Sequence, residues 1–196
     1  SNNGPASLGP PVTSRGVYTT PIQVDPFSIS SEDKLGLLLE SDRRMDSVKG
    51  ISARTGNLIF IKEHKTFAHS EGAHVEQTIH EAGGGIMATA RGNGEVQRRS
   101  YPQSMRQQGG AGWEFVDAMD LVGNAERIAT EAVALLSADH CPSGVTTLIV
   151  GASQLGLQIH ESCGHAIELD RVLGSEAAYA GTSFLTTDKL NNFQYG

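Results

Sequence analysis

The run His-Glu-Ser-Cys-Gly-His at residues 160–165 places the strictest demand on how this 196-residue chain can fold. Two histidines and a carboxylate in so short a run are able to hold a zinc ion and to supply a general base beside it. In the common metalloprotease pattern the two histidines are four residues apart, but His160 and His165 are five apart. On a regular α-helix, positions five apart point about 140° away from each other. Both rings reach one metal only if the helix widens locally into a π-type turn, and Gly164 is the residue that tolerates such a distortion best.

The motif by itself does not complete a metal site. A catalytic zinc usually has three protein ligands and one open position, whereas the motif offers His160 and His165. Cys163, Glu168 and Asp170 are local candidates for a third ligand, but their spacing selects none of them, and the ligand could lie outside this chain. The alternative interpretation is that all of these are ordinary polar residues of a helix, with Cys163 as a small buried filler.

The remaining histidines are predicted to have no metal role. We expect His64, His69, His74 and His80 on the surface or on a strand face, and His140 in a loop. No nucleotide cofactor is expected either, because the glycine-rich residues 109–112 lack the lysine and hydroxyl group of a phosphate-binding loop.

Composition excludes several functional classes. The net charge of −7 gives no electrostatic reason to expect a nucleic acid partner. The sequence contains no apolar run long enough to span a membrane and no visible secretory leader. Its 2 cysteines do not make a disulfide framework, which favours the cytoplasm as the compartment.

Local signals along the chain predict an α+β fold. Ser30 or Ser31, followed by two acids, favours the start of a helix that ends near Gly50, with Leu35, Leu39 and Met45 among its buried residues. Polar and apolar residues alternate over 73–80, and turn signals at 55–57 and 92–94 separate short strands. The expected order is a helix, an antiparallel β-meander of about five strands and a long helical segment over 114–138, which Gly123 or Asn124 could interrupt. A strand at 145–150 and the metal-ligand helix opening a β-rich domain are expected to follow.

Three segments are expected in the domain organisation. Residues 1–16 are predicted to be a flexible lead-in, because they are rich in Gly, Pro, Ser and Asn. Residues 17–141 are predicted to form an α+β middle domain, and residues 142–196 the start of a catalytic domain.

The residues around the motif resemble a known family. Leu-Gln-Ile-His-Glu-Ser-Cys-Gly-His at 157–165, continued by Glu-Leu-Asp-Arg-Val-Leu-Gly at 168–174, is similar to the signature of the TldD/PmbA peptidases. The preceding order of a sheet-rich region, a glycine-rich loop near Trp113 and a long helix is also similar, so the resemblance covers residues 17–196. It implies a fragment that contains the middle domain and the start of the catalytic C-terminal domain, without the family's N-terminal α/β region.

This resemblance also implies roles for the motif residues. In that family the TldD-type subunit is a zinc-dependent peptidase and the PmbA-type subunit lacks the motif, so this chain is similar to the TldD type. By that resemblance His160 and His165 bind zinc, and Glu161 is the catalytic base that activates a zinc-bound water. The family's third ligand is a cysteine further downstream, which Cys163 does not replace, so we expect the fragment itself to be inactive.

Partners follow from the resemblance as well. It implies a peptide or unfolded protein substrate, admitted to a chamber between the subunits of a homodimer or of a heterodimer with a PmbA-type subunit. The alternative is a non-enzymatic partner or regulatory subunit, since family members are linked by name to gyrase modulation. Such a subunit has no need for His160, Glu161 and His165 together.

Overall fold

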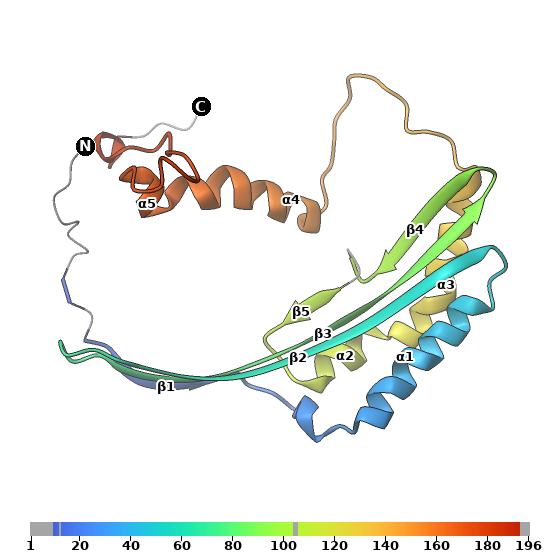
Figure 1. The fold of residues 1–196 in the computed structure, drawn as a ribbon, viewed down its shortest axis with the longest axis horizontal. Helices are drawn as coiled ribbons and strands as arrows, with labels where there is room; N and C mark the ends of the chain where they lie inside the picture. The colour runs from blue at the N-terminus through green and yellow to red at the C-terminus, as the bar shows by residue number, and fades with distance from the viewer. Residues whose placement is uncertain (1–9, 12, 104–105, 193–196) are drawn as a thin grey trace. The chain divides into compact units, whose positions relative to one another are not determined.

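The structure is a computed structural model that describes residues 10–11, 13–103 and 106–192 (Figure 1). It divides into two compact units, Ser1–His140 and Cys141–Gly196. Helices and a five-stranded sheet occur together, which confirms the predicted α+β class. In the described part of the chain, no helix has both the length and the apolar character that crossing a membrane requires.

The sheet of the first unit is built around one long central strand, β3. Its neighbour β2 runs antiparallel to it, with Ile51 opposite Ala90 at one end and Ala68 opposite His74 at the other. Along the other side of β3 lie β1 in parallel orientation and then β5 and β4 in antiparallel orientation. The strands are β1 (Arg15–Thr19), β2 (Ile51–Ala68), β3 (His74–Gly92), β4 (Glu95–Tyr101) and β5 (Gln107–Gly109).

Strand β1 corrects two predictions. The expected meander is antiparallel throughout, but β1 pairs in parallel with β3, because it reaches the sheet from a distant part of the chain rather than through a hairpin. Arg15 and Gly16 were expected in the flexible lead-in, yet both belong to this strand. Residues 1–9 and 12 of the predicted lead-in lie outside the described residues.

One of the two predicted turns is confirmed and the other is wrong. Asn93 and Gly94 join β3 to β4 with φ values of 52° and 78°, as a hairpin turn of the primed type requires. At Gly56, in contrast, β2 continues without a turn. A Cβ atom at Gly56 would lie 3.0 Å from Cδ2 of Leu38, so this glycine makes room for a helix side chain on the sheet.

The first helix, α1 (Ser31–Asp46), begins where the sequence predicts. The hydroxyl group of Ser30 accepts a hydrogen bond from the N–H of Asp33 at 3.0 Å, which satisfies one of the free donors of the first turn. The predicted buried stripe is only partly correct. Met45 is buried, but Leu35 and Leu39 are 58% and 60% exposed.

The helical segment predicted over 114–138 is interrupted, although not at Gly123 or Asn124 themselves. It consists of α2 (Trp113–Met119), α3 (Leu121–Ala134) and the short η2 (Leu135–Ser137). The break lies at Asp120, whose φ is 47° and whose carboxylate accepts the N–H of Gly123 at 3.0 Å. A Cβ atom at Gly123 would lie 2.1 Å from Oδ2 of Asp120, so the aspartate cap and the glycine are a matched pair.

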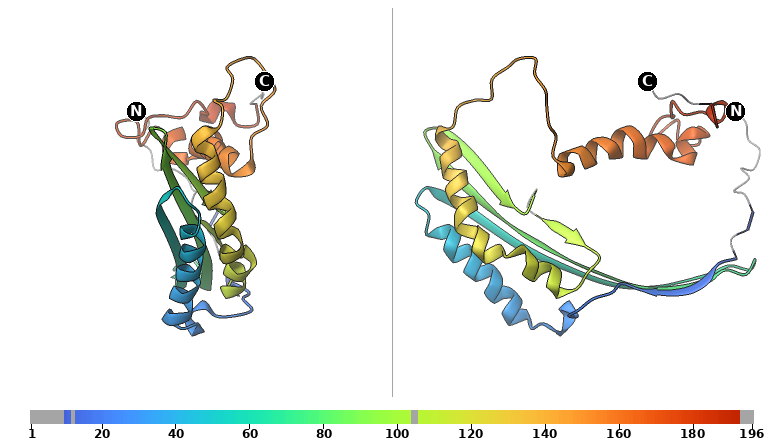
Figure 2. Two further views of the ribbon diagram at one scale, coloured as in Figure 1. Left: turned by 90° about the vertical axis from the view of Figure 1, so that its right-hand side faces the viewer. Right: turned by 180° about the vertical axis from the view of Figure 1, so that it is seen from behind.

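Helices α1, α2 and α3 pack on one face of the sheet (Figures 1 and 2). Side chains from α1, α3 and β3, with Met119 at the end of α2, form the main core. Trp113 and Val116 of α2 form a smaller cluster with Ala82 of β3. The main buried cluster contains Met45, Ile86, Ala88, Ala90, Met119, Leu121, Ala125, Ile128, Ala129 and Ala132.

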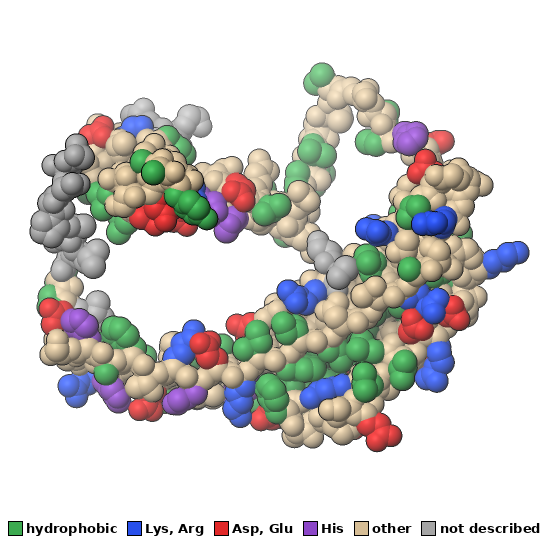
Figure 3. Space-filling model, in the orientation of Figure 1, with side chains coloured by type: hydrophobic (Ala, Val, Ile, Leu, Met, Phe, Trp, Pro, Cys, Tyr) green, Lys and Arg blue, Asp and Glu red, His purple; other side chains and the backbone are tan. Residues whose placement is uncertain are grey.

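Ion pairs at the surface link helices to strands. From β2, Arg54 places Nε 2.8 Å from Oδ1 of Asp42 and Nη1 2.6 Å from Oδ1 of Asp46, both in α1. From β4, Arg99 places Nε 2.7 Å from Oε2 of Glu131 in α3. Exposed pairs of this kind contribute about 0–1 kcal/mol each, so the core rather than these pairs holds the layers together. On the face drawn in Figure 3, basic and acidic side chains are interspersed over this unit.

Glu114 fastens the segment before α1 to the start of α2. Its carboxylate accepts the N–H of Gly112 at 2.8 Å and the N–H of Val24 at 3.1 Å, and the N–H of Trp113 donates to the carbonyl of Val24 at 2.9 Å. Burial raises the pKa of Glu114, but hydrogen bonds from the backbone N–H groups of Gly112, Glu114 itself, Val24 and Gln23 together lower it more strongly, to about 2.

We expect the substitution Glu114→Gln to destabilise the first unit by about 1–3 kcal/mol at neutral pH. Because the pKa in the folded state lies below the ordinary value of 4.5, the carboxylate stabilises the fold above pH 4.5, and this contribution is lost as the pH falls towards 2. Urea unfolding of both proteins over this range should show the two stabilities converging in acid. A difference that is the same at pH 7 and at low pH would contradict the assigned role.

The second unit contains short helices and no strand among its described residues. The strand expected at 145–150 is wrong: Val145, Leu148 and Ile149 are almost fully exposed, and no described segment of this unit offers a strand to pair with. The helical segments are α4 (Ala152–Ile159), the π-helix η3 (His160–Gly164), η4 (His165–Ile167), α5 (Leu169–Val172) and η5 (Thr187–Lys189).

Candidate metal centre

The motif lies on a widened helical turn, as its spacing predicts. Helix α4 runs directly into the π-helix η3, and the N–H of His165 bonds to the carbonyl of His160, five residues earlier. This bond carries His165 round to the face that His160 occupies. Gly164 is not what makes the wide turn possible, because it has an ordinary helical φ of −57° and a Cβ atom there would approach only the carbonyl oxygen of Ile159, at 3.9 Å.

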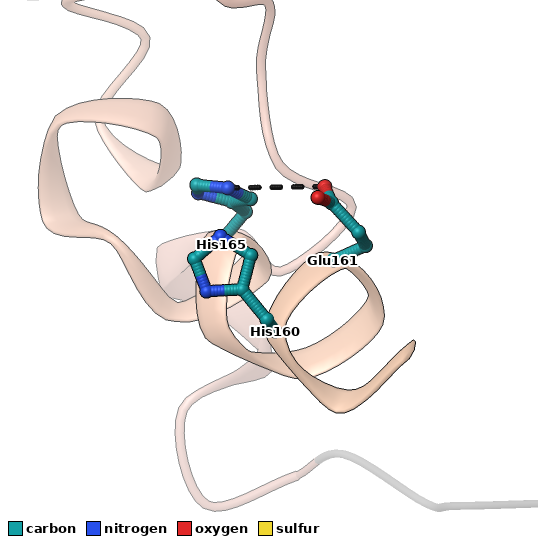
Figure 4. A group of neighbouring side chains, drawn as sticks. All are labelled: His160, Glu161 and His165. Atoms are coloured by element: carbon teal, nitrogen blue, oxygen red, sulfur yellow. Dashed lines mark ion pairs between the residues drawn. The ribbon is translucent and has the colours of Figure 1, made fainter. Parts of the chain in front are cut away.

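Three side chains of the motif converge on one point (Figure 4). The ring centroids of His160 and His165 are 4.4 Å apart, with the ring planes inclined by 73°. Nε2 of His165 lies 3.8 Å from Oε2 of Glu161. One potential ligand atom from each of the three residues lies within 4.8 Å of the other two, which makes the three side chains a candidate metal-binding group.

The chemistry of this donor set fits zinc. Zinc prefers imidazole nitrogen, thiolate sulfur and carboxylate oxygen, and two imidazoles with one carboxylate belong to that range. His160 and Glu161 are exposed and His165 is partly buried, so a metal and a small substrate group can approach the site from solvent. Among the described residues, no other group of three or more His, Cys, Asp or Glu side chains has this geometry.

None of the three local candidates for a third ligand belongs to this group. Cys163 is exposed, so the prediction that it is a small buried filler is wrong, but its sulfur does not join the two rings. Glu168 contacts the other ring nitrogen of His165, Nδ1, at 3.1 Å. The carboxylate of Asp170 accepts the N–H of Arg171 at 2.8 Å. Within the described residues the site therefore has two imidazoles and the carboxylate of Glu161.

The remaining histidines are placed as predicted, with one exception. His64, His69 and His74 are exposed on the long hairpin, and His140 is exposed in a loop. His80, in contrast, is buried at 4% exposure. The alternating pattern of β3 does not reveal this burial. The segment that follows β1 lies against this residue, because the hydroxyl group of Thr20 accepts the backbone N–H of His80 at 3.1 Å.

Comparison with known proteins identifies the family. The sequence model of the PmbA/TldA metallopeptidase central domain matches residues 24–136, which are more than half of the chain and cover most of the first unit. The chain therefore belongs to the PmbA/TldD family of metallopeptidases.

Three archaeal relatives carry the name metalloprotease. The protein of Archaeoglobus fulgidus is 26% identical over 172 residues, covering 87% of this chain and 38% of the relative. Those of Methanocaldococcus jannaschii and Methanothermobacter thermautotrophicus are 27% and 26% identical, each covering 80% of this chain and 33% of the relative. The chain thus spans little more than a third of the length of these relatives. Any single stretch of 172 residues within 196 includes residues 160–165, so the first of these matches extends over the motif.

Proposed function

We propose that this chain is part of a zinc-dependent peptidase of the TldD type, which hydrolyses peptide bonds in unstructured peptides. The observation that carries the proposal is the π-helix, since it brings donor atoms of His160, Glu161 and His165 within 4.8 Å of one another. Family membership and the names of the three relatives support a metallopeptidase.

The three side chains have distinct roles in this proposal. One nitrogen from each of the rings of His160 and His165 holds zinc, which when bound supplies a Lewis acid that polarises the scissile carbonyl and acidifies water. The carboxylate of Glu161 lies beside these nitrogens, where it accepts a proton from the attacking water. As the carbon–nitrogen bond breaks, Glu161 gives this proton to the departing amine, so that the carboxylate is regenerated.

The substrate and the assembly are proposals of the same kind. His160 and Glu161 are exposed in this chain, which suits an extended peptide that must reach both of them. We expect the complete protein to act in the cytoplasm as a homodimer or as a heterodimer with a PmbA-type subunit. We expect the 196-residue chain alone to be inactive, because two imidazoles fall short of the three protein ligands of a usual catalytic zinc.

Removal of the metal tests this function in the complete protein. Cleavage of an unstructured fluorogenic peptide should stop after treatment with a chelator and return on addition of zinc, but not of magnesium. Cleavage that continues after zinc has been removed would contradict a zinc peptidase. No cleavage in any metal state would favour the alternative of a non-enzymatic partner or regulatory subunit.

A further inference from the structure

A second carboxylate, that of Glu168, lies behind the metal-facing side of His165. Its Oε1 atom is 3.1 Å from Nδ1 of His165, within hydrogen-bonding distance, while Nε2 of the same ring faces Glu161. The Oε2 atom of Glu168 is 2.7 Å from Nε of Arg171. The carboxylate is therefore held between the imidazole of His165 and the guanidinium group of Arg171.

The local backbone explains why Glu168 points back to His165. Helix η4 ends at Ile167, and Glu168 adopts an extended conformation with a ψ of 123° before α5 begins at Leu169. This change of direction separates Glu168 from the helical path and places its side chain against the residue three positions earlier. Ser183 stabilises this bend, because the hydroxyl group of Ser183 donates a hydrogen bond to the carbonyl of Ala166 at 2.6 Å.

The chemistry of this contact determines which nitrogen of His165 is available to a metal. An ionised carboxylate only accepts hydrogen bonds, and a neutral imidazole has one N–H group. If Nδ1 faces the carboxylate of Glu168, the ring proton resides on Nδ1 and the lone pair of Nε2 is free. The other carboxylate oxygen of Glu168 contacts Arg171, whose side chain is only 23% exposed, so solvent screens this ion pair less than a fully exposed one.

We infer that Glu168 is a positioning residue of the metal centre, which fixes His165 in the tautomer that presents Nε2 to the metal. It acts through His165 and is not itself a ligand, because it lies at the ring nitrogen that is turned away from Glu161. The metal-binding consequence of this inference rests on the proposed function, whereas the tautomer of His165 can be measured without any metal.

Nitrogen NMR of the histidine rings tests the tautomer in the metal-free chain, in alkaline buffer where imidazole is neutral. His165 should carry its proton on Nδ1, and Glu168→Ala should shift a large part of the population to the Nε2–H form. Glu168→Gln, which keeps the size of the side chain and removes its charge, should give an intermediate result. Asp170→Ala is the matched control, because this exposed acid is two residues away and does not contact His165.

The inference is overturned if His165 is protonated on Nε2 in the unaltered chain, or if Glu168→Ala leaves its nitrogen signals unchanged. Amide spectra of each variant show whether it is folded. If Glu168→Ala is not folded, the nitrogen signals of His165 in Glu168→Gln decide whether Glu168 sets the tautomer.

Zinc affinity, measured by competition with a chelator, tests the consequence for the metal. Glu168→Ala should weaken zinc binding about 10- to 100-fold, whereas Asp170→Ala should leave it unchanged. Zinc bound equally well by the Glu168 variants would overturn the positioning role and leave the proposed function intact. A tautomer that changes as expected, in a complete protein that binds no zinc, would support the positioning of His165 and contradict the proposed function.

Discussion

Replacing Glu161 with glutamine should leave zinc in place and abolish peptide cleavage by the complete protein. Glutamine has the same shape as glutamate but cannot accept the proton of the attacking water. General base catalysis typically contributes 10²- to 10⁴-fold to a rate, so we expect a loss of about that size in turnover. The side chain of Glu161 is 63% exposed, so the substitution should not disturb folding.

The experiment compares turnover and zinc content in the same preparations. Asp170→Asn is a suitable control, because it removes one exposed negative charge from the same unit without touching the three metal-centre residues. It should retain both zinc and turnover. Turnover within a few-fold of normal in Glu161→Gln would exclude this residue as the catalytic base, and loss of zinc in that variant would make it a ligand instead.

The largest effect on stability is expected from Ile86→Ala. Ile86 is fully buried on the central strand β3, where it packs in the main core beneath α1 and α3. Removing three carbon atoms from such a site costs about 2–5 kcal/mol, because the apolar burial is lost and a cavity remains. Ile61→Ala is the matched control, since the same substitution at a residue of β2 that is 38% exposed should cost much less.

Thermal and urea unfolding of the 196-residue chain measure both variants. A loss of 2–5 kcal/mol corresponds to a fall in Tm of roughly 5–15 °C for a domain of this size. Equal losses at Ile86 and Ile61 would mean that the face of the sheet covered by the helices is not the main core.

Local signals in the sequence predict the parts of the fold that depend on neighbouring residues. The cap at Ser30 and the Asn93-Gly94 turn each need only a few adjacent side chains, and both occur where expected. The widened helix at 160–165 is predictable for a different reason. Two histidines five apart can share a metal only if the helix has that form, so the chemistry of the motif determines its geometry.

Features that depend on distant residues are not visible in the local pattern. Gly56 lies in a Thr-Gly-Asn run that is typical of a turn, but the side chain of Leu38 from α1 occupies the space above it. The backbone hydrogen bond of His80 and the contacts of Glu114 both involve residues 20–24, which are far away in the sequence. The strand expected at 145–150 fails for the related reason that an apolar, β-branched run forms a strand only beside a partner.

Within the metal centre, the sequence identifies His160, Glu161 and His165 as candidates but does not place the residues around them. Glu168 is visible only as one of three possible ligands, because the side of the ring that it contacts depends on the bend after Ile167. The sequence alone therefore does not distinguish a ligand from a residue that orients a ligand.

The most direct test of a shared metal site is the zinc content of the complete protein, measured by elemental analysis after loading with zinc and removal of the excess. We predict about one zinc per chain. The metal should be lost in His160→Ala and retained in His74→Ala, since His74 is an exposed histidine of the long hairpin in the other unit. Zinc retained in His160→Ala, or no zinc in any of the three proteins, would contradict the proposal that the π-helix of this chain holds a metal.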